Sequence, residues 1–205
     1  GRPKVFVGHV ADRDEAYVNE PIAYRYEIWQ RVDAGLEPLS LPTFKDFYVE
    51  DLPVGKVEIR RIADGTRYRV HTLMRRVLYP QRAGEIEIGP GEIKVSPQVA
   101  FGLFARPSST PPFTVKGRPF VVDVAPLPAE GQPPGFSANN VGRFRVESTV
   151  DRKVVDVGDG LTWTVEVSGE GNVRALDPGA WPEVPGFRVY DPKERYEPAQ
   201  AADRV

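Results

Sequence analysis

Valine is the residue type that most constrains the fold of this 205-residue chain. The chain contains 28 valines but only 10 leucines, and isoleucine, phenylalanine and tyrosine supply most of the other large apolar side chains. β-Branched and aromatic side chains lose rotamer freedom in a helix, whereas they pack well on a pleated, half-buried surface. The composition therefore favours strands over helices.

Apolar and polar residues alternate in several short segments, which is the period of a strand with one buried face. Over residues 22–28 and 120–124 the large apolar side chains occupy every second position. Turn signals separate such segments, and Asp64-Gly65 predicts a hairpin because both residues tolerate a positive φ. We therefore predict an all-β protein, built as a sandwich of short antiparallel strands.

An internal repeat divides the sequence in two. At a shift of 139 positions Asp12-Arg13 matches Asp151-Arg152, and Glu27 matches Glu166. The apolar positions that match at the same shift are Ile22, Tyr24, Tyr26 and Ile28 with Leu161, Trp163, Val165 and Val167. At a shift of 140, residues 47–51 match residues 187–191. We infer two copies of one domain type.

A stretch rich in proline and glycine, residues 126–140, lies between the two copies. We predict a first domain over residues 1–125, this linker, and a second domain over residues 141–205. The second copy has no counterpart to the region from Val57 to Val124, so its sheet would leave strand edges unpaired. We therefore expect the second domain to be truncated and the chain to be part of a longer protein.

Charge and cysteine content exclude several functions. The chain has 27 basic and 29 acidic side chains, and neither half is basic enough to predict nucleic-acid binding. The absence of cysteine excludes disulfides, Cys-ligated zinc, iron–sulfur clusters and thiol catalysis. No apolar run in the sequence approaches the ~18 residues of a membrane-spanning helix.

The residues that could support catalysis are few. The only histidines are His9 and His71, no serine lies in a Gly-x-Ser-x-Gly turn, and we expect His71 to be a solvated strand residue. Glu85 and Glu87 share one strand face, but the intervening isoleucines claim the buried face, so no burial would raise either pKa for acid catalysis. We predict no enzyme activity, no catalytic residues and no cofactor.

Oxygen donors cluster near the start of each copy. Asp12, Asp14 and Glu15 lie in the first copy, Asn139-Asn140 at the junction and Asp151 in the second copy. Calcium between domains uses such ligands, but no Asp-x-Asp-x-Asp-Gly loop is present. We therefore predict turn-forming residues and no metal site, with calcium at the junction as the alternative.

Two groups of residues are candidates for partner binding. The first is basic and is formed by Arg67, Arg69, Arg75 and Arg76. It would dock an acidic partner through bidentate contacts, unless these arginines form an ordinary polar sheet face balanced by glutamates. The second group is Trp29 and Trp181, which would either stack on sugar rings or cover a domain edge.

Four segments carry a resemblance to a known family: residues 47–53, 79–90, 169–172 and 185–192, which read FYVEDLP, YPQRAGEIEIGP, GEGN and PGFRVYDP. Together they resemble the BatD-like oxygen-tolerance family. The resemblance implies tandem immunoglobulin-like domains on the far side of the cytoplasmic membrane, with a signal peptide and a membrane anchor outside this sequence. It also implies partners among von Willebrand factor A-domain proteins and genes for MoxR-type ATPases nearby.

These observations lead to one functional hypothesis and one alternative. We expect a non-enzymatic, periplasmic or otherwise extracytoplasmic scaffold that presents rigid sheet faces to protein partners. Oxygen tolerance and envelope stress enter only through the resemblance. The alternative is a carbohydrate-binding β-sandwich module that uses the tryptophans, because sandwich folds support many functions.

Overall fold

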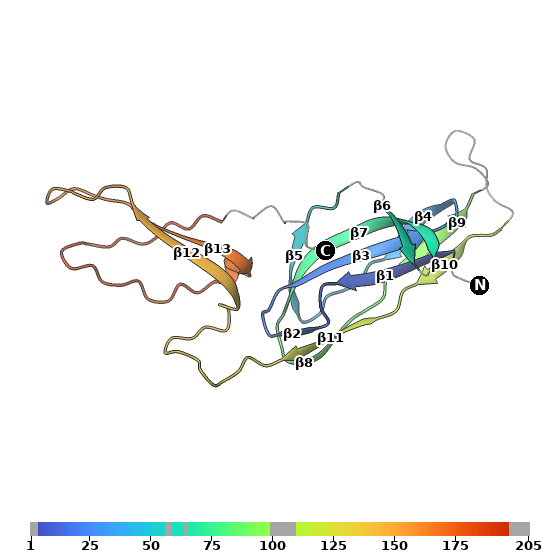
Figure 1. Cartoon of the computed structure of the whole chain (residues 1–205), viewed down its shortest axis with the longest axis horizontal. Coiled ribbons are helices and arrows are strands. Elements are labelled where there is room, and N and C mark those ends of the chain that lie inside the picture. The colour runs from blue at the N-terminus through green and yellow to red at the C-terminus, as the bar shows by residue number, and fades with distance from the viewer. Residues whose placement is uncertain (1–3, 56–58, 64, 99–109, 197–205) are drawn as a thin grey trace.

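Strands make up nearly all the regular structure of the described residues, in agreement with the all-β prediction. The computed structural model describes residues 4–55, 59–63, 65–98 and 110–196 (Figure 1). The strands are β1 (Val5–Ala11), β2 (Glu15–Tyr17), β3 (Ile22–Gln30), β4 (Ala34–Ser40), β5 (Phe47–Leu52), β6 (Ile59–Ala63), β7 (Thr66–Pro80), β8 (Gly84–Ile88), β9 (Glu92–Pro97), β10 (Phe113–Lys116), β11 (Phe120–Ala125), β12 (Gly142–Val150) and β13 (Trp163–Gly171). A short 3₁₀ turn, η2 (Val173–Ala175), follows the last strand.

The first eleven strands form a sandwich. One layer is a five-stranded sheet with the order β1-β3-β7-β5, and β6 also pairs with β7. Two three-stranded sheets, β10-β9-β4 and β2-β11-β8, supply the residues that pack against it. The core includes Tyr24, Tyr26 and Leu78 from the first layer, and Ile93 and Val122 from the others. Alternating apolar residues meet between layers, which is what a period of two predicts.

Two local predictions are confirmed. β6 pairs antiparallel with β7 as the expected hairpin, and Gly65 in its turn has a φ of 73°. Asp64, the other turn residue, lies outside the described residues. In β8 the isoleucines are buried while Glu85 and Glu87 are exposed, so the two carboxylates do lie on a solvated face.

The expectation that His71 is solvated is wrong. Tyr26 of β3 lies opposite Met74 of β7, but the next residue, Glu27, lies opposite Thr72. The register between the two strands therefore shifts by one residue at this point. This irregularity leaves one extra residue in β7 and reverses which side chains face inward beyond it. His71 consequently lies opposite Ile28 on the inner side, and its Nε2 atom is buried. Simple alternation along the sequence could not reveal this bulge.

β12 and β13 form a two-stranded antiparallel ribbon beside the sandwich, joined to it by the proline-rich linker (Figure 1). The linker contains turns, such as the one closed by the hydrogen bond from Phe136 N to Pro133 O, at 3.0 Å. It also contacts the sandwich, since the Asn19 side-chain amide donates to Ala138 O. After β13 and η2, the chain continues without further strands through the rest of its described residues.

The ribbon repeats the register of β1 and β3. In the first copy Val7 lies opposite Ile28, and in the second Val146 lies opposite Val167. Both residues of this pair are shifted by 139 positions. The same shift converts each of the remaining residue pairs between β1 and β3 into a residue pair between β12 and β13. An equal shift on both strands means that the two ribbons share one pattern of hydrogen bonds.

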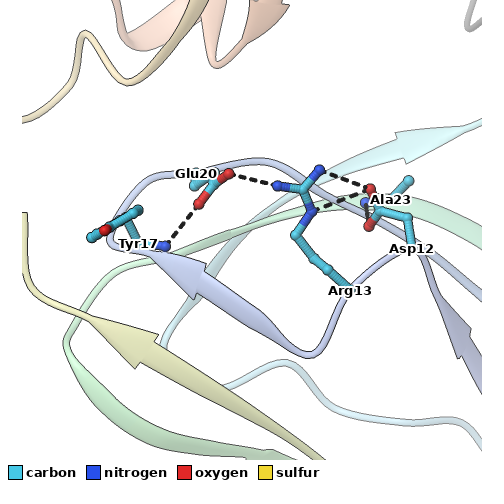
Figure 2. Close-up of polar contacts among 5 residues, drawn as sticks. All are labelled: Asp12, Arg13, Tyr17, Glu20 and Ala23. Atoms are coloured by element: carbon cyan, nitrogen blue, oxygen red, sulfur yellow. Dashed lines mark hydrogen bonds and ion pairs between the residues drawn. The ribbon is translucent and has the colours of Figure 1, made fainter.

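An aspartate at the end of each ribbon makes the same contacts in both copies. Asp12 N donates to Ala23 O, while Ala23 N donates to the Asp12 side chain at 2.9 Å (Figure 2). In the second copy Asp151 N donates to Thr162 O, and Thr162 N donates to the Asp151 side chain at 2.8 Å. The local geometry therefore recurs at the shift of 139 that the sequence predicted.

The turns also recur. Asn19, with a φ of 63°, corresponds to Gly158, with a φ of 100°, at the shift of 139. At the shift of 140, Asp46 with a φ of 66° corresponds to Gly186 with a φ of 83°. Positive φ is costly for most residues, and Asn, Asp and Gly tolerate it best. These matches reach beyond the ribbon and support the interpretation that the chain holds two copies of one unit.

Candidate interaction surface

The β12–β13 ribbon has one apolar and one polar face. Alternation places on one face, which we call the apolar ribbon face, the residues Phe144, Val146, Ser148, Val150, Trp163, Val165 and Val167. The Trp163 indole nitrogen donates to Ser148 Oγ at 2.7 Å, which confirms that these two side chains share a face. The opposite face carries charged and hydroxyl side chains. Such a ribbon normally buries its apolar face against another layer.

Corresponding positions in the two copies differ in exposure. Val7 is 6% exposed, whereas its counterpart Val146 is 63% exposed. Tyr24 is 2% exposed, whereas its counterpart Trp163 is 37% exposed. In the first copy β1 and β3 are covered by the opposing layer of the sandwich. The prediction that Leu161 to Val167 line a core as Ile22 to Ile28 do is therefore wrong: the register repeats, but in the described structure the second copy does not form a buried core.

Part of the apolar ribbon face is contacted by the segment that returns after η2. Trp181 meets Trp163 edge-to-face, with 5.7 Å between the ring centroids. Both rings keep more than a third of their surface exposed. Trp181 therefore lies beside this face, and its partner is Trp163, which the repeat alone places at a core position.

The polar face of the ribbon has an imbalance of charge at its centre. Glu147 and Glu166 lie directly opposite one another. Arg145 pairs with Glu147, with 2.8 Å between Nε and Oε1. Like charges in opposite positions on neighbouring strands disfavour the pairing, so a further positive charge near Glu166 would stabilise this face.

Contacts between the sandwich and the second copy centre on Tyr79. Its hydroxyl donates to Gly171 O, at the end of β13, at 3.2 Å. Nearby, the Tyr196 hydroxyl donates to Glu50 at 2.7 Å, and the Arg174 guanidinium lies 4.2 Å from the centre of the Tyr196 ring. These contacts join β5 and β7 to the segment around the ribbon and hold the ribbon near one end of the sandwich.

Burial raises the pKa of the tyrosines at this contact. For Tyr79 burial has the largest effect, and the negative charge of Glu50 adds to it. For Tyr196 burial again comes first, followed by the hydrogen bond to Glu50. Both hydroxyls therefore keep their protons at neutral pH, so they act as hydrogen-bond donors.

The four candidate arginines do not form one free basic surface. Arg69 pairs with Asp33 at 2.6 Å, and Arg76 pairs with Asp51 at 2.7 Å. Arg75 donates to Pro53 O at 3.5 Å, while Arg67 is exposed next to the β6–β7 turn. The bulge in β7 separates Arg67 and Arg69 from Arg75 and Arg76. Arg75 and Arg76 are consecutive in β7 and point to opposite sides of the sheet, so the four arginines do not share one sheet face either.

Trp29 lies in an aromatic cluster of the sandwich. Its ring stacks on Phe6 at 5.4 Å, and Tyr68 approaches it edge-on at 6.0 Å. Its indole nitrogen donates to Glu27 at 3.0 Å. Phe6 thus covers one face of the Trp29 ring, and the Glu27 carboxylate accepts from its only hydrogen-bond donor. The surroundings of Trp29 therefore differ from those of Trp181.

Asp12, one of the three proposed calcium donors of the first copy, has protein partners. The Asp12 carboxylate accepts from Ala23 N and pairs with Arg13, which also pairs with Glu20 at 2.5 Å (Figure 2). At the junction Asn140 exchanges two hydrogen bonds with the Asp177 backbone, each 2.8 Å long. In the described part of the chain, no group of three or more His, Cys, Asp or Glu side chains is arranged to hold a metal ion.

An open pocket of about 300 Å³ is lined by residues of β3, β4 and β7. It is lined mainly by apolar side chains, together with Gln30 and His71. The Gln30 Oε1 and His71 Nε2 atoms are buried and have no hydrogen-bond partner. The other histidine, His9, binds Tyr24 and Arg118 O through its two ring nitrogens.

Comparisons with family models, curated proteins and solved structures give no match to this chain. Among the described residues, no helix combines the length and the apolarity that crossing a bilayer demands. The geometry of the two copies is therefore the main guide to function.

Proposed function

We propose that this protein is a non-enzymatic interaction module that binds protein partners through the apolar ribbon face. The observation that carries the proposal is the contrast between corresponding valines, Val7 buried and Val146 exposed, in ribbons of identical register. Contiguous exposed apolar side chains mark surfaces that other molecules cover. In this ribbon the exposed Val146 and Val150 flank Ser148, and the half-buried Val165 lies opposite Ser148.

The sandwich serves as the platform in this proposal. Its large core gives it a rigid structure, and the contacts of Tyr79 and Tyr196 hold the ribbon at one end of it. A partner would then meet a surface whose orientation is largely fixed before binding. Such preorganisation reduces the entropy lost on association.

The sequence resemblance supplies the biological setting of the proposal. Resemblance to the BatD-like oxygen-tolerance family supports immunoglobulin-like domains, an extracytoplasmic location and anchoring in the membrane by a segment outside these residues. It also points to von Willebrand factor A-domain membrane proteins as the partners. The role would be assembly of an envelope complex that helps cells tolerate oxygen or envelope stress.

Binding to a purified A-domain protein encoded next to this one tests the proposal. Val146→Asp places a charge on the apolar ribbon face and should weaken binding about tenfold or more. Thr149→Asp places the same charge on the polar face of β12 and is the matched control, for which we expect little change. Equal affinities for the wild type and Val146→Asp, measured by calorimetry, would contradict the proposal.

Carbohydrate binding is the second candidate, and the exposed pair of Trp163 and Trp181 is the observation that favours it. Aromatic rings at a surface suit stacking against sugars, but an edge-to-face pair offers only part of each ring. A glycan array separates the candidates. Glycan binding that disappears in Trp181→Ala would favour this function, and its absence would favour the protein partner.

A further inference from the structure

The outer edge of β13 is unpaired within the described part of the chain. In the first copy β3 lies between two strands, β1 on one side and β7 on the other. In the second copy β13 pairs with β12, and the sheet ends there. Because the two ribbons share one register, the free edge of β13 corresponds to the edge of β3 that pairs with β7.

The hydrogen bonds of the ribbon show which backbone groups point to this free edge. Asp151 N donates to Thr162 O, so Thr162 is directed toward β12. In an antiparallel pair such residues alternate with residues directed to the opposite side. The backbone groups of Trp163, Val165 and Val167 consequently point away from β12. Unpaired groups in such a row are a template for another strand.

Charge on the polar face indicates what a strand at this edge must carry. In the first copy Glu27 pairs with Arg25, with 2.6 Å between Oε1 and Nε. The counterpart of Arg25 in the second copy is Thr164, and Glu166, the counterpart of Glu27, has no ion pair among the described residues. A basic side chain on the incoming strand would supply the missing charge.

The geometry points to the free edge of β13 as an acceptor for one extended polypeptide strand, antiparallel to β13. The strand would be apolar at alternate positions, continuing the face of Val165 and Val167, and basic on the side of Glu166. It would complete the second copy as β7 completes the first. This inference rests on the proposed function and adds backbone pairing to the apolar contact.

The register between β3 and β7 predicts how such a strand would align. Trp29 lies opposite Val70, and Arg25 lies opposite Arg75. At the shift of 139, Ser168 takes the place of Trp29 and Thr164 takes the place of Arg25. A peptide based on β7 should therefore bind with its Val70 position opposite Ser168.

Disulfide trapping can test this alignment in the full chain, because the chain has no cysteine of its own. The probe is a synthetic peptide of residues 66–80 with His71→Val, Thr72→Arg and Arg76→Val, which makes it apolar opposite Val167 and Trp163 and basic opposite Glu166. Ser168→Cys in the protein should form a disulfide with a Val70→Cys peptide about tenfold faster than with an Arg75→Cys peptide. Both peptide positions face the same side of the strand, so the second peptide is a control for exposure alone.

Val165→Pro tests whether the backbone edge is required. Proline removes a backbone N–H that points away from β12, so the pairing between β12 and β13 is retained. We expect this variant to lose the preference for the Val70→Cys peptide. Val165→Ala keeps the N–H and should retain the preference, which separates edge pairing from apolar contact. Near-ultraviolet circular dichroism of Trp163 and Trp181 checks that each ribbon is folded.

Each outcome decides the inference. Faster trapping of the Val70→Cys peptide that Val165→Pro abolishes supports it. Equal trapping of both peptides, or no trapping, overturns it. If Ser168→Cys instead links two protein chains, the edge is occupied by a second copy and the inference is also overturned. Loss of A-domain binding in Val146→Asp together with failed trapping would leave the proposed function in place and remove only the strand acceptor.

Discussion

The β1–β3 and β12–β13 ribbons have the same backbone design and opposite surroundings. Both have an aspartate that accepts from the far strand, a residue with positive φ in the connecting loop and the same register. One is buried in a sandwich, while the other leaves Val146, Val150 and Trp163 of its apolar face exposed. Register and turns are therefore determined within the ribbon itself, whereas burial depends on strands supplied from elsewhere.

The two copies also differ in the polarity of their inner faces. In the first copy the Tyr26 hydroxyl accepts from Gly91 N at 3.1 Å, and the Tyr24 hydroxyl bonds His9 at 2.7 Å. The counterpart of Tyr24 is Trp163 and the counterpart of Tyr26 is Val165, and neither side chain carries a hydroxyl. The inner face of the second copy therefore suits a less polar covering layer than that of the first.

The largest expected effect comes from one substitution made at both corresponding positions. Val7→Ala should lower the free energy of unfolding by about 2 kcal/mol, because it removes buried methyl groups and leaves a cavity. Val146→Ala should change it by less than about 0.5 kcal/mol, because that side chain is exposed. Urea denaturation followed by circular dichroism measures both. Equal losses would show that the two ribbons are buried alike.

The aspartate contacts give the next effect. Asp12→Ala and Asp151→Ala each remove the acceptor of a backbone N–H, so each should destabilise its own ribbon by about 1 kcal/mol. Asp→Asn at either position retains an acceptor and should recover most of the loss. Amide exchange at Ala23 and Thr162 reports the two sites separately. A loss in one copy alone would mean that the aspartates do not have equivalent roles.

The smallest expected effect is a pH dependence confined to the first copy. Burial is the main cause that lowers the pKa of His9 below 6.5, and the hydrogen bond to Arg118 O only partly opposes it. As the pH falls below 6.5 the unfolded chain takes up this proton before the folded chain does, so stability decreases. As the pH is lowered, the melting temperature should fall less in His9→Gln than in the wild type. The second copy has no histidine, so it contributes nothing to this difference.

Much of the fold could be predicted from residue spacing. Alternation identified β3, β8 and β11 and their buried faces, Asp64-Gly65 marked the β6–β7 hairpin, and the repeat gave the shift of 139 positions. The bulge in β7 was not predictable, because only pairing with β3 shows that an extra residue interrupts the alternation. That bulge turned His71 inward, against expectation. The parallel pairing of β2 with β11 is likewise a consequence of tertiary contact.

The candidate site was harder to predict than the fold. Trp181 was singled out from the sequence, whereas Trp163 was treated only as a match to a core position of the first copy and Val146 was not considered. Their exposure follows from what the second copy does not contain, namely counterparts to β7 and to the opposing layer among the described residues. The four arginines were candidates because they lie close together in the sequence. In the fold, however, Arg69 and Arg76 form ion pairs with carboxylates of the same chain.

Hydrogen exchange of the β13 amides tests the central claim most directly, since the claim is that β13 repeats β3 but has one edge free. We expect slow exchange at Thr164, Glu166 and Ser168, whose amides face β12, and fast exchange at Val165 and Val167. In β3, the corresponding amides of Tyr26 and Ile28 should be slow, because β7 covers that edge. Equal protection of Val165 and Glu166 would contradict the account.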